Sequence, residues 1–452
     1  MDEIAKLLKD GGKFLRRIPQ SEEIDHSRIP GYKTPANDPL LLKFARETKT
    51  KYIMSTSTIS SAIIQMYFMF SNFRSPDFNH MSDDYENQPR KFMVSQRKPS
   101  TCFIKPIDKK AGIYALESDN GIFVKPTAVL SDLGKIVERQ LTMTPEDFER
   151  GLVKGKIDPE MAIDDDHHRF MKLNENICLR SQIDCRQMGE DGVDRVFEIK
   201  TRAVAPIRYD LANYKNYLDY DISYVRGVHS SFEREYYDLI RGGFMKYSFQ
   251  LRIGRMDGAF IAYHNTLENL GFEYVKASEI EKRLFGSKQA ADAAFVCCSK
   301  LLTTLLDELL KDASGEDYSL MRVGYYADGV NHKMTVFSEL FYDLDQWKEE
   351  DLIQPSHEIQ HEYDFYEKVW KNKPRKLLKY TFNVFVYING IKQTTPDYVI
   401  RPNDTLEIRY SLQREGKPTQ SDYMYFLHEA FKLESSTLSM HYIGTWIKDK
   451  NN

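Results

Sequence analysis

The sequence predicts a mixed fold of the α/β or α+β class, because strand patterns and helix patterns alternate along most of its length. The chain has 452 residues, of which 41% are hydrophobic and 29% are charged. These proportions are typical of packed globular proteins and argue against global disorder. The length corresponds to one large domain or to two or three ordinary domains. No internal repeat is visible.

The first third of the chain is expected to hold an arm, one long helix and several short strands. Residues 1–50 are polar and contain four prolines, which predicts an extended, largely irregular arm with some helix. The apolar stretch 59–73 is shorter than the roughly 20 residues that a membrane span needs. We therefore expect a buried helix over 51–73, with N-cap candidates at 55–58, then a loop over 75–100. Short strands with hairpin patterns are expected at 101–107, 112–118 and 121–126.

The rest of the chain continues the alternation of helices and strands. A helix is expected from Ser131 to 142, and residues 145–170 have the composition of a charged insertion. Two strands, 177–186 and 195–203, precede a long helical pattern over 230–256. The later elements are expected to be a strand at 257–265, helices at 278–286 and 290–313, strands at 319–327, 333–340, 380–390 and 405–412, and a closing helix at 421–435. Asn389-Gly390 marks a hairpin turn within this tail.

Charge and cysteine content limit the classes of function. The formal net charge is −4, so a nucleic-acid partner would need a local basic surface rather than an overall basic chain. The five cysteines are an odd number and show no CxxC spacing. This usage indicates a reducing compartment and no structural zinc site.

One strand carries an unusual pair of charged residues. Glu198 and Lys200 lie two positions apart within the apolar stretch 195–203, so both side chains point to the same face. Asp184 ends the preceding strand, 14 residues before Glu198, and Gly189 and Gly192 suit the turn between the two strands. A surface Glu–Lys ladder on an edge strand is the ordinary alternative.

This pattern suits metal-dependent cleavage of phosphodiesters, which needs hard oxygen ligands and a group that positions water. Asp184 and Glu198 are candidate ligands for Mg²⁺ or Mn²⁺, and the carbonyl oxygen of Ile199 is a third candidate. Lys200 would orient the attacking water or balance charge on the phosphate. The sequence therefore predicts a nuclease site on a hairpin.

The arrangement resembles the PD-(D/E)XK nuclease superfamily, in its RecB-like or lambda-exonuclease-like branch. The resemblance implies a core with a central mixed sheet flanked by helices. It also implies two further residues: a Glu on a preceding helix, matched by Glu138 as a catalytic residue and metal ligand, and a Gln on a following helix, matched by Gln250. One departure is visible, because the branch often has Tyr four residues after that Gln, and this chain has Gly254.

Basic residues near these motifs are candidates for binding the RNA backbone. Arg202 and Arg208 follow Lys200 in a stretch without acids, and Arg252 and Arg255 end the helical pattern after Gln250. A rim of cations that only aids solubility is the alternative. Residues 368–379 hold six Lys or Arg next to aromatic side chains, which suits single-stranded RNA or an ordinary linker.

Longer segments resemble a family of fungal mitochondrial, membrane-associated RNA-processing proteins of the petite-complementing (PET) series. These segments include "FEIKTRAVAPIR" and the block 230–266, and the likeness extends over about residues 40–340. The resemblance implies a mitochondrial 5′→3′ exoribonuclease that acts on single-stranded RNA with a 5′ end. It also implies links to the organelle's RNA polymerase and RNA turnover machinery, and a matrix location with possible peripheral association with the inner membrane. The first residues do not read as a transit peptide, because Asp2, Glu3 and Asp10 are acidic.

With this likeness, four regions are expected: an arm at 1–50, a helix with hairpins at 51–130, the nuclease core at 131–315 and a β-rich part at 316–452. Two rival functions stay open, a DNA exonuclease on the same fold and a non-catalytic RNA-binding scaffold. Two other groups of polar residues are discounted. Residues 164–168 are consecutive in a charged loop, and Asp257 and His264 would lie on opposite faces of one strand.

Overall fold

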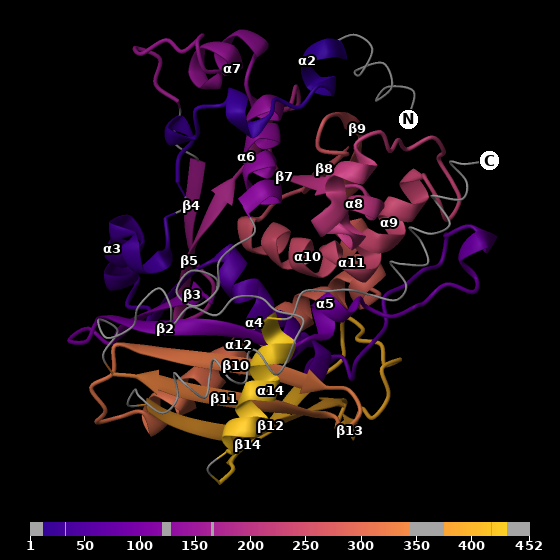
Figure 1. Ribbon diagram of the computed structural model, residues 1–452. Helices are drawn as coiled ribbons and strands as arrows, with labels where there is room; N and C mark the ends of the chain where they lie inside the picture. The colour runs from indigo at the N-terminus through magenta and orange to yellow at the C-terminus, as the bar shows by residue number, and fades with distance from the viewer. Residues whose placement is uncertain are drawn as a thin grey trace.

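The strands of the protein form two sheets that are joined through a layer of helices (Figure 1). The computed structural model describes residues 12–31, 33–119, 128–163, 167–342, 375–416 and 418–431. Within these residues one sheet has ten strands and the other has four. The expectation of a mixed α/β fold with a large mixed sheet flanked by helices is confirmed.

The large sheet combines strands from the two ends of the chain. Its order is β13-β12-β11-β10-β2-β3-β1-β5-β4, and β14 also pairs with β12. Strand β1, third from the β4 edge, is parallel to both of its neighbours, and the other pairs are antiparallel. The strands are β1 (Tyr52–Ser55), β2 (Ser100–Asp108), β3 (Ile113–Ser118), β4 (His167–Lys172), β5 (Ile177–Ile183), β10 (Leu320–Asp328), β11 (Lys333–Phe341), β12 (Arg375–Ile388), β13 (Ile391–Lys392) and β14 (Leu406–Arg414).

The small sheet has the order β6-β7-β8-β9 and carries the Glu-x-Lys motif on β7. Its strands are β6 (Cys185–Met188), β7 (Asp194–Ala203), β8 (Gly258–His264) and β9 (Asn269–Lys276). The pair β7–β8 is parallel, so the chain must cross over between them, and helices α8, α9 and α10 make this crossover.

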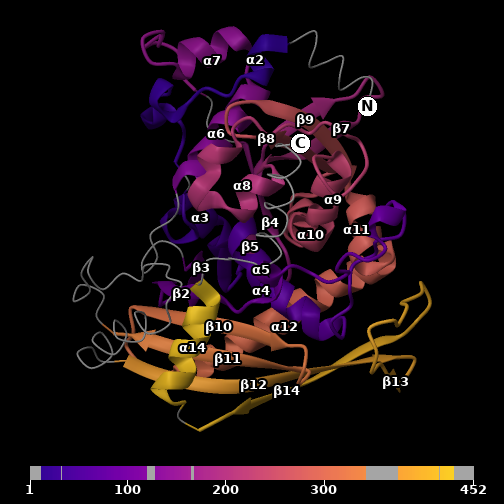
Figure 2. The same ribbon diagram turned by 45° about the vertical axis from the view of Figure 1, so that its right-hand side comes forward.

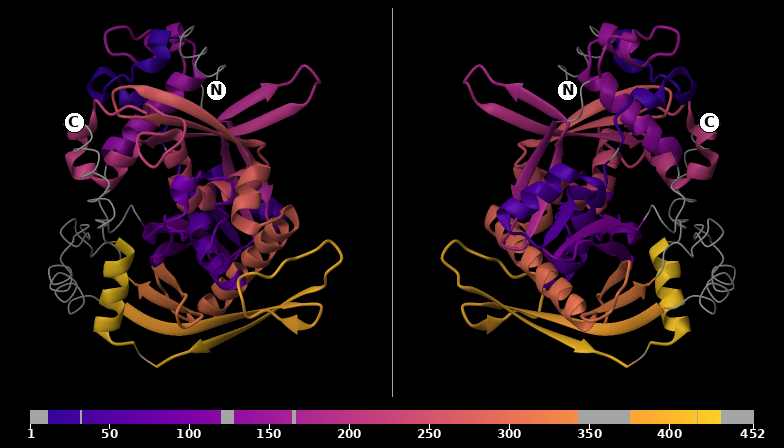
Figure 3. Two further views of the ribbon diagram at one scale, coloured as in Figure 1. Left: turned by 90° about the vertical axis from the view of Figure 1, so that its right-hand side faces the viewer. Right: turned by 90° about the vertical axis from the view of Figure 1, so that its left-hand side faces the viewer.

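Helices fill the space between the two sheets and cover their outer faces. Figure 3 shows the small sheet at one end of the molecule and strands β10–β14 at the other, and Figure 2 shows α4 and α12 between them. The longer helices are α3 (Pro39–Thr48), α4 (Thr56–Phe70), α6 (Ala128–Thr142), α7 (Pro145–Leu152), α9 (Phe232–Arg241), α10 (Gly243–Gly254), α11 (Ala277–Phe285), α12 (Lys288–Asp312) and α14 (Gln420–Phe431). Three shorter ones are α2 (Gly12–Arg16), α5 (Val94–Arg97) and α8 (Ala205–Tyr209).

Helix α4 is the centre of the hydrophobic core. Ser55 caps it through a capping box with Thr58, and almost every following side chain is buried. Burial on all sides explains why the sequence of α4 is apolar all round. Among the described helices none combines the length and the apolar character that crossing a bilayer requires.

Several boundaries differ from those expected from the sequence. Residues 52–55 form strand β1 rather than the start of a helix, and the arm contains helix α3. The charged insertion 145–170 contains α7 and the first part of β4. The long helix at 230–256 is divided into α9 and α10 at Gly242, and β9 was not expected. The strand expected at 121–126 lies outside the described residues.

Candidate active site

Asp184 lies where the two sheets part. Strand β5 of the large sheet ends at Ile183, and β6 of the small sheet begins at Cys185. The single strand expected over 177–186 is therefore divided at Asp184, and β6 alone forms the hairpin with β7. Cys185 pairs with Phe197, so the register brings Asp184 level with Glu198. One carboxylate oxygen of Asp184 accepts a hydrogen bond of 2.9 Å from the backbone N–H of Ile199, which replaces a bond of the ladder.

Glu198 and Lys200 share one face of β7, as their spacing predicts. Lys200 donates a hydrogen bond from Nζ to Oε1 of Glu198. Glu198 is buried, with 6% of its surface exposed. The ammonium group of Lys200 also lies 5.8 Å from the centre of the Tyr247 ring, on α10. A charged pair enclosed in this way is not an exposed surface ladder, so the ordinary alternative for the motif is excluded.

The electrostatics show that negative charge is in excess at this point. The pKa of Asp184 is raised well above its usual range by burial and by the neighbouring carboxylates of Glu198 and Glu138. Lys200 and the N–H of Ile199 act in the opposite direction. Burial would lower the pKa of Lys200, but Glu198 and Asp184 outweigh burial and raise it. Lys246 on α10 is a second ammonium group close to Glu198, so three carboxylates face two ammonium groups, and a further cation would relieve the remaining repulsion.

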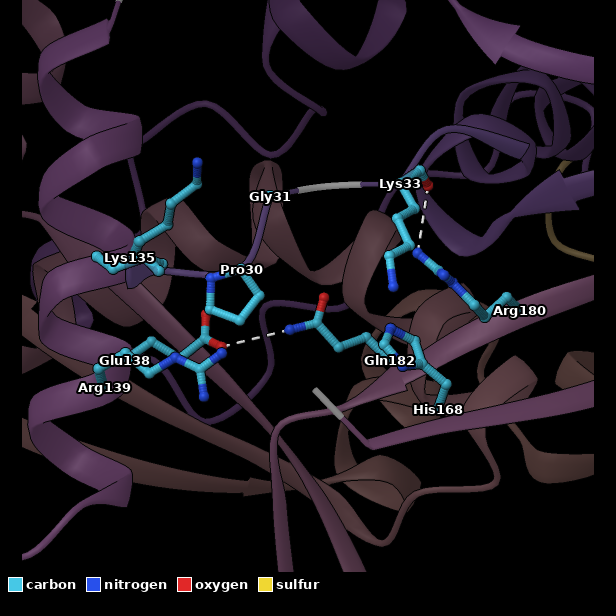
Figure 4. Close-up of a pocket in the computed structure, with 10 residues that line it drawn as sticks. Pro30, Gly31, Lys33, Lys135, Glu138, Arg139, His168, Arg180 and Gln182 are labelled. Carbon is cyan, nitrogen blue, oxygen red and sulfur yellow. Dashed lines mark hydrogen bonds between the residues drawn. The ribbon is translucent and has the colours of Figure 1, made fainter. Parts of the chain in front are cut away.

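Glu138 reaches the site from α6. This helix packs against the face of the small sheet that carries Thr201, opposite to the face of Glu198 and Lys200 on β7. Gly134 lets α6 approach closely, because an added Cβ there would lie 3.2 Å from Oγ1 of Thr201 on β7. Glu138 is one helical turn further along, and the side-chain amide of Gln182 donates to it over 3.4 Å (Figure 4). Gln182 is two residues before Asp184, and nothing in the sequence pattern singled it out.

Gln250 is on the face of α10 that is turned toward the site. Lys246, Gln250 and Gly254 are four residues apart, so they share one side of the helix. Lys246 lies near Lys200: burial and the charge of Lys200 lower the pKa of Lys246. At the other end, a Cβ on Gly254 would lie 3.1 Å from Oγ of Ser181 on β5. Gln250 is buried between them, and its amide oxygen has no hydrogen-bond partner among the described residues.

The close contact at Gly254 accounts for the departure from the superfamily pattern. A Cβ at this position would also lie 2.4 Å from Cε of Met256. A side chain at this position would therefore require Met256 and Ser181 to shift. Glycine suits this close packing, and the departure does not exclude Gln250 from the site.

The residues fit a magnesium or manganese ion that is bound by few protein groups. Among the described residues no group of three or more His, Cys, Asp and Glu side chains is placed to hold a metal. Mg²⁺, however, commonly keeps several waters and takes only one or two carboxylates together with phosphate oxygens of a substrate. Asp184 and Glu198 could provide two hard oxygen ligands to such an ion, and the amide oxygen of Gln250, which has no hydrogen-bond partner among the described residues, could be a further acceptor.

The four arginines expected to bind RNA have different surroundings. Arg208 donates to Glu235 and Asp238, and Arg252 donates to Glu281 and Asp292, so both are held in ion pairs. These acids lie on other helices, so the sequence around each arginine gave no sign of the ion pairs.

The other two arginines differ in how far their side chains are exposed to solvent. Arg202 follows Lys200 on the same face of β7, is partly buried, and has no hydrogen-bond partner at Nε among the described residues. Arg255 is exposed at the end of α10. The basic stretch 368–379 lies largely outside the described residues.

Of the two discounted groups, only the pair Asp257 and His264 lies fully within the described residues, and its two side chains are at opposite ends of β8. The carboxylate of Asp257 accepts the N–H of Val196 and fixes the start of β8, while His264 is buried at the far end of that strand. Residues 164–166 lie outside the described part, and His168 is paired with Gln182 across β4 and β5.

Comparisons with solved structures give only a distant likeness. Crystal structures of Rai1 from Scheffersomyces stipitis and of Candida albicans Rai1 in complex with pU5-Mn2+ align with TM-scores of 0.33 and 0.30. The first covers 69% of this chain and 81% of that chain at 13% identity; the second covers 73% and 79% at 12% identity. At these TM-scores the likeness supports no inference about the site.

Sequence comparisons find relatives in two yeasts. The "mRNA degradation protein pet127, mitochondrial" of Schizosaccharomyces pombe is 29% identical over 300 residues, which is 65% of this chain and 56% of that protein. The "putative mitochondrial translation system component PET127" of Saccharomyces cerevisiae is 35% identical over 257 residues, 56% of this chain and 30% of that protein. The chain thus matches about half or less of the length of each relative. The family model described as mitochondrial protein Pet127 matches residues 32–307. Because this match covers more than half of the chain, the protein belongs to the Pet127 family.

Proposed function

We propose that this protein is a metal-dependent 5′→3′ exoribonuclease that trims or degrades mitochondrial RNA. The observation that carries the proposal is the enclosed group of Asp184, Glu198 and Lys200 at the junction of the two sheets. Its carboxylates outnumber the ammonium groups that face them, and carboxylates with raised pKa values are frequent at functional sites.

The roles of the residues follow from their chemistry. Asp184 and Glu198 would hold Mg²⁺ or Mn²⁺, with Glu138, the carbonyl oxygen of Ile199 and Gln250 as further candidates, and the bound ion would supply a Lewis acid for the phosphate. Lys200 would donate hydrogen bonds to the attacking water or to the phosphate oxygens, and its raised pKa keeps it charged. Arg202, on the same face, would contact the phosphate backbone, and Arg255 would contact it from the end of α10. We expect direct attack by water without a covalent intermediate.

The substrate and its location rest on the relatives. One relative is named for mRNA degradation, and both are named mitochondrial, which favours RNA in mitochondria as the target. We also propose contacts with the mitochondrial RNA polymerase and RNA turnover machinery, and peripheral association with the inner membrane. The direction of digestion, from the 5′ end, is proposed from the resemblance to the fungal mitochondrial RNA-processing family.

The proposal is tested with single-stranded RNA and DNA of equal sequence, each labelled at the 5′ or the 3′ end. The purified protein is incubated with each in Mg²⁺, and the products are followed with time. We expect early release of short 5′-labelled products from RNA, while the 3′ label stays on long fragments.

The other outcomes identify the rival functions. Faster digestion of DNA would keep the site but overturn the choice of substrate, since the fold does not decide it. Early release of the 3′ label would overturn the direction. Intact RNA that is nevertheless bound would support a non-catalytic scaffold.

A further inference from the structure

A basic pocket adjoins the candidate active site on the side of α6. It has a volume of about 230 Å³ and lies between α6, β4, β5, residues 29–31 and Lys33 (Figure 4). Its lining consists of Ile29, Pro30, Gly31, Lys33, Lys135, Glu138, Arg139, His168, Arg180 and Gln182. Four of these residues are Lys or Arg, and Glu138 is the only acid among them. The lining is thus basic on a chain whose net charge is −4, although Asp38 balances the charge of Arg180.

The cations come from three different parts of the chain and are directed to one space. Lys135 and Arg139 are one turn apart on α6, and Lys33 reaches in from the opposite side. Arg180, on β5, is held by the carboxylate of Asp38 at 2.9 Å and by the carbonyl oxygen of Lys33 at 3.2 Å. A guanidinium group fixed in this way is already oriented for a ligand and loses little freedom on binding.

The pocket shares two residues with the site. Glu138 and Gln182 line the pocket, and they are joined to each other by a hydrogen bond. Glu138 also raises the pKa of Asp184, so the pocket and the candidate metal ligands are electrostatic neighbours. A strand of RNA whose scissile phosphate lies at Asp184 and Lys200 would therefore bring a neighbouring phosphate close to the pocket.

We propose that this pocket binds a phosphate group of the RNA strand next to the one that is cleaved. The inference rests on the proposed function and adds the contacts that hold the substrate. Several cations around one small space match the charge and oxygen geometry of a phosphate. That phosphate is either the terminal 5′-phosphate or an internal phosphate of the backbone, since both present anionic oxygens to the cations of the pocket.

Binding measurements distinguish these sources. The Asp184→Asn protein, which should not degrade its ligand, is titrated with fluorescent RNA that carries either a 5′-phosphate or a 5′-hydroxyl. The double variant Lys135→Ala/Arg139→Ala removes two cations from the exposed side of α6, where alanine favours the helix. Gly31→Glu adds a negative charge to the lining, and a Cβ at Gly31 has nothing within 4 Å. Lys300→Ala, at an exposed position of α12, is the control.

We expect both pocket variants to weaken binding by about tenfold or more and to reduce its salt dependence, with no change for the control. Weakening confined to the 5′-phosphorylated RNA would identify the terminal phosphate, and equal weakening of both RNAs would identify an internal one. Unchanged affinity for both RNAs in both pocket variants would overturn the inference. Cleavage by the wild-type protein is scored separately, so a failure of the proposed function is not mistaken for a failure of the pocket.

Discussion

At the scale of single residues, Asp184 and Glu198 are the side chains whose surroundings are hardest to explain without a function. They approach each other where the sheets part, and Lys200 is the cation that faces both. Removing a carboxylate from water is costly unless it is paired. A bound divalent cation would repay that cost.

The first prediction concerns metal binding. Asp184→Asn and Glu198→Gln each keep the shape of the side chain but remove a ligand, so the dissociation constant for Mn²⁺ should rise. Loss of an outer partner of a metal site weakens affinity by roughly 10–100-fold, and loss of a ligand should weaken it at least as much. Calorimetric titration measures this. Glu190→Gln, in the exposed turn of the same hairpin, is the matched control. Equal affinity in all four proteins would show that the carboxylates do not bind metal.

Substitution of Lys200 should reduce the rate of RNA cleavage without reducing the affinity for the metal ion. Lys200→Met removes the charge but keeps most of the length of the side chain. The cleavage rate with saturating Mg²⁺ should fall by about 100-fold or more, as for loss of a group that stabilises the transition state. Mn²⁺ affinity should be unchanged or higher, because the variant lacks a cation that competes for Glu198. A loss of metal affinity together with activity would mean that Lys200 only maintains the structure.

His264 predicts how the free energy of unfolding depends on pH. Burial and the charge of Arg208 lower its pKa to about 4 in the folded protein, against 6.5 when it is exposed. The unfolded chain therefore binds more protons below about pH 6.5, so stability should fall as the pH decreases from about 6.5 to 4. The contribution is about 3 kcal/mol.

Denaturant unfolding at a series of pH values tests this contribution. His264→Gln should flatten the fall in stability over this range. His80→Asn serves as the control, because His80 is exposed and its left-handed backbone is one that Asn tolerates. An identical pH profile for the wild type and His264→Gln would contradict the assignment.

At the scale of elements, the contact between α10 and β5 determines where Gln250 lies. Gly254 permits the contact, and Met256 and Ser181 occupy the space that a side chain would need. Gly254→Tyr, the residue of the superfamily pattern, should therefore overpack this contact and lower the free energy of unfolding by about 3 kcal/mol. Thermal unfolding measures the change, and Gly416→Ala, with open space around its Cβ, should be nearly neutral. A stable Gly254→Tyr protein would show that α10 does not pack this closely.

The elements also show which parts of the fold could be predicted from the sequence. Periodicity and caps were sufficient to find α4, α12 and most strands, because these elements obey local rules. Strand β1 was missed because its four buried residues continue directly into an apolar helix. The break between α9 and α10 falls at two glycines inside one continuous helical pattern. A Cβ on Gly243 would lie 3.1 Å from side-chain atoms of Leu239 and Tyr247, so there is little room for a side chain.

At the scale of the whole molecule, the large sheet joins distant parts of the chain into one core. Strand β10 pairs with β2, and Arg322 of β10 forms a buried ion pair of 2.9 Å with Asp119. The regions expected at 51–130 and 316–452 thus share a sheet. Long-range pairing of this kind has no local signal, so the sequence indicated its strands but not their order.

The candidate site could likewise be predicted only where its residues are close together in the sequence. Asp184, Glu198 and Lys200 were found from spacing along one hairpin, which is local information. The acids that hold Arg208 and Arg252, and the cations of the pocket, come together only through the fold. The role of Gln182 likewise depends on the position of α6.

The central claim is that the junction of the two sheets is a metal-dependent catalytic site. The most direct test is the initial rate of Mg²⁺-dependent RNA cleavage by the wild-type protein, Asp184→Asn and the control Glu190→Gln. We expect the rate of Asp184→Asn to fall by at least about 1000-fold, the upper range for loss of one catalytic group, while Glu190→Gln matches the wild type. Equal rates in wild type and Asp184→Asn would contradict the account and place any nuclease activity elsewhere.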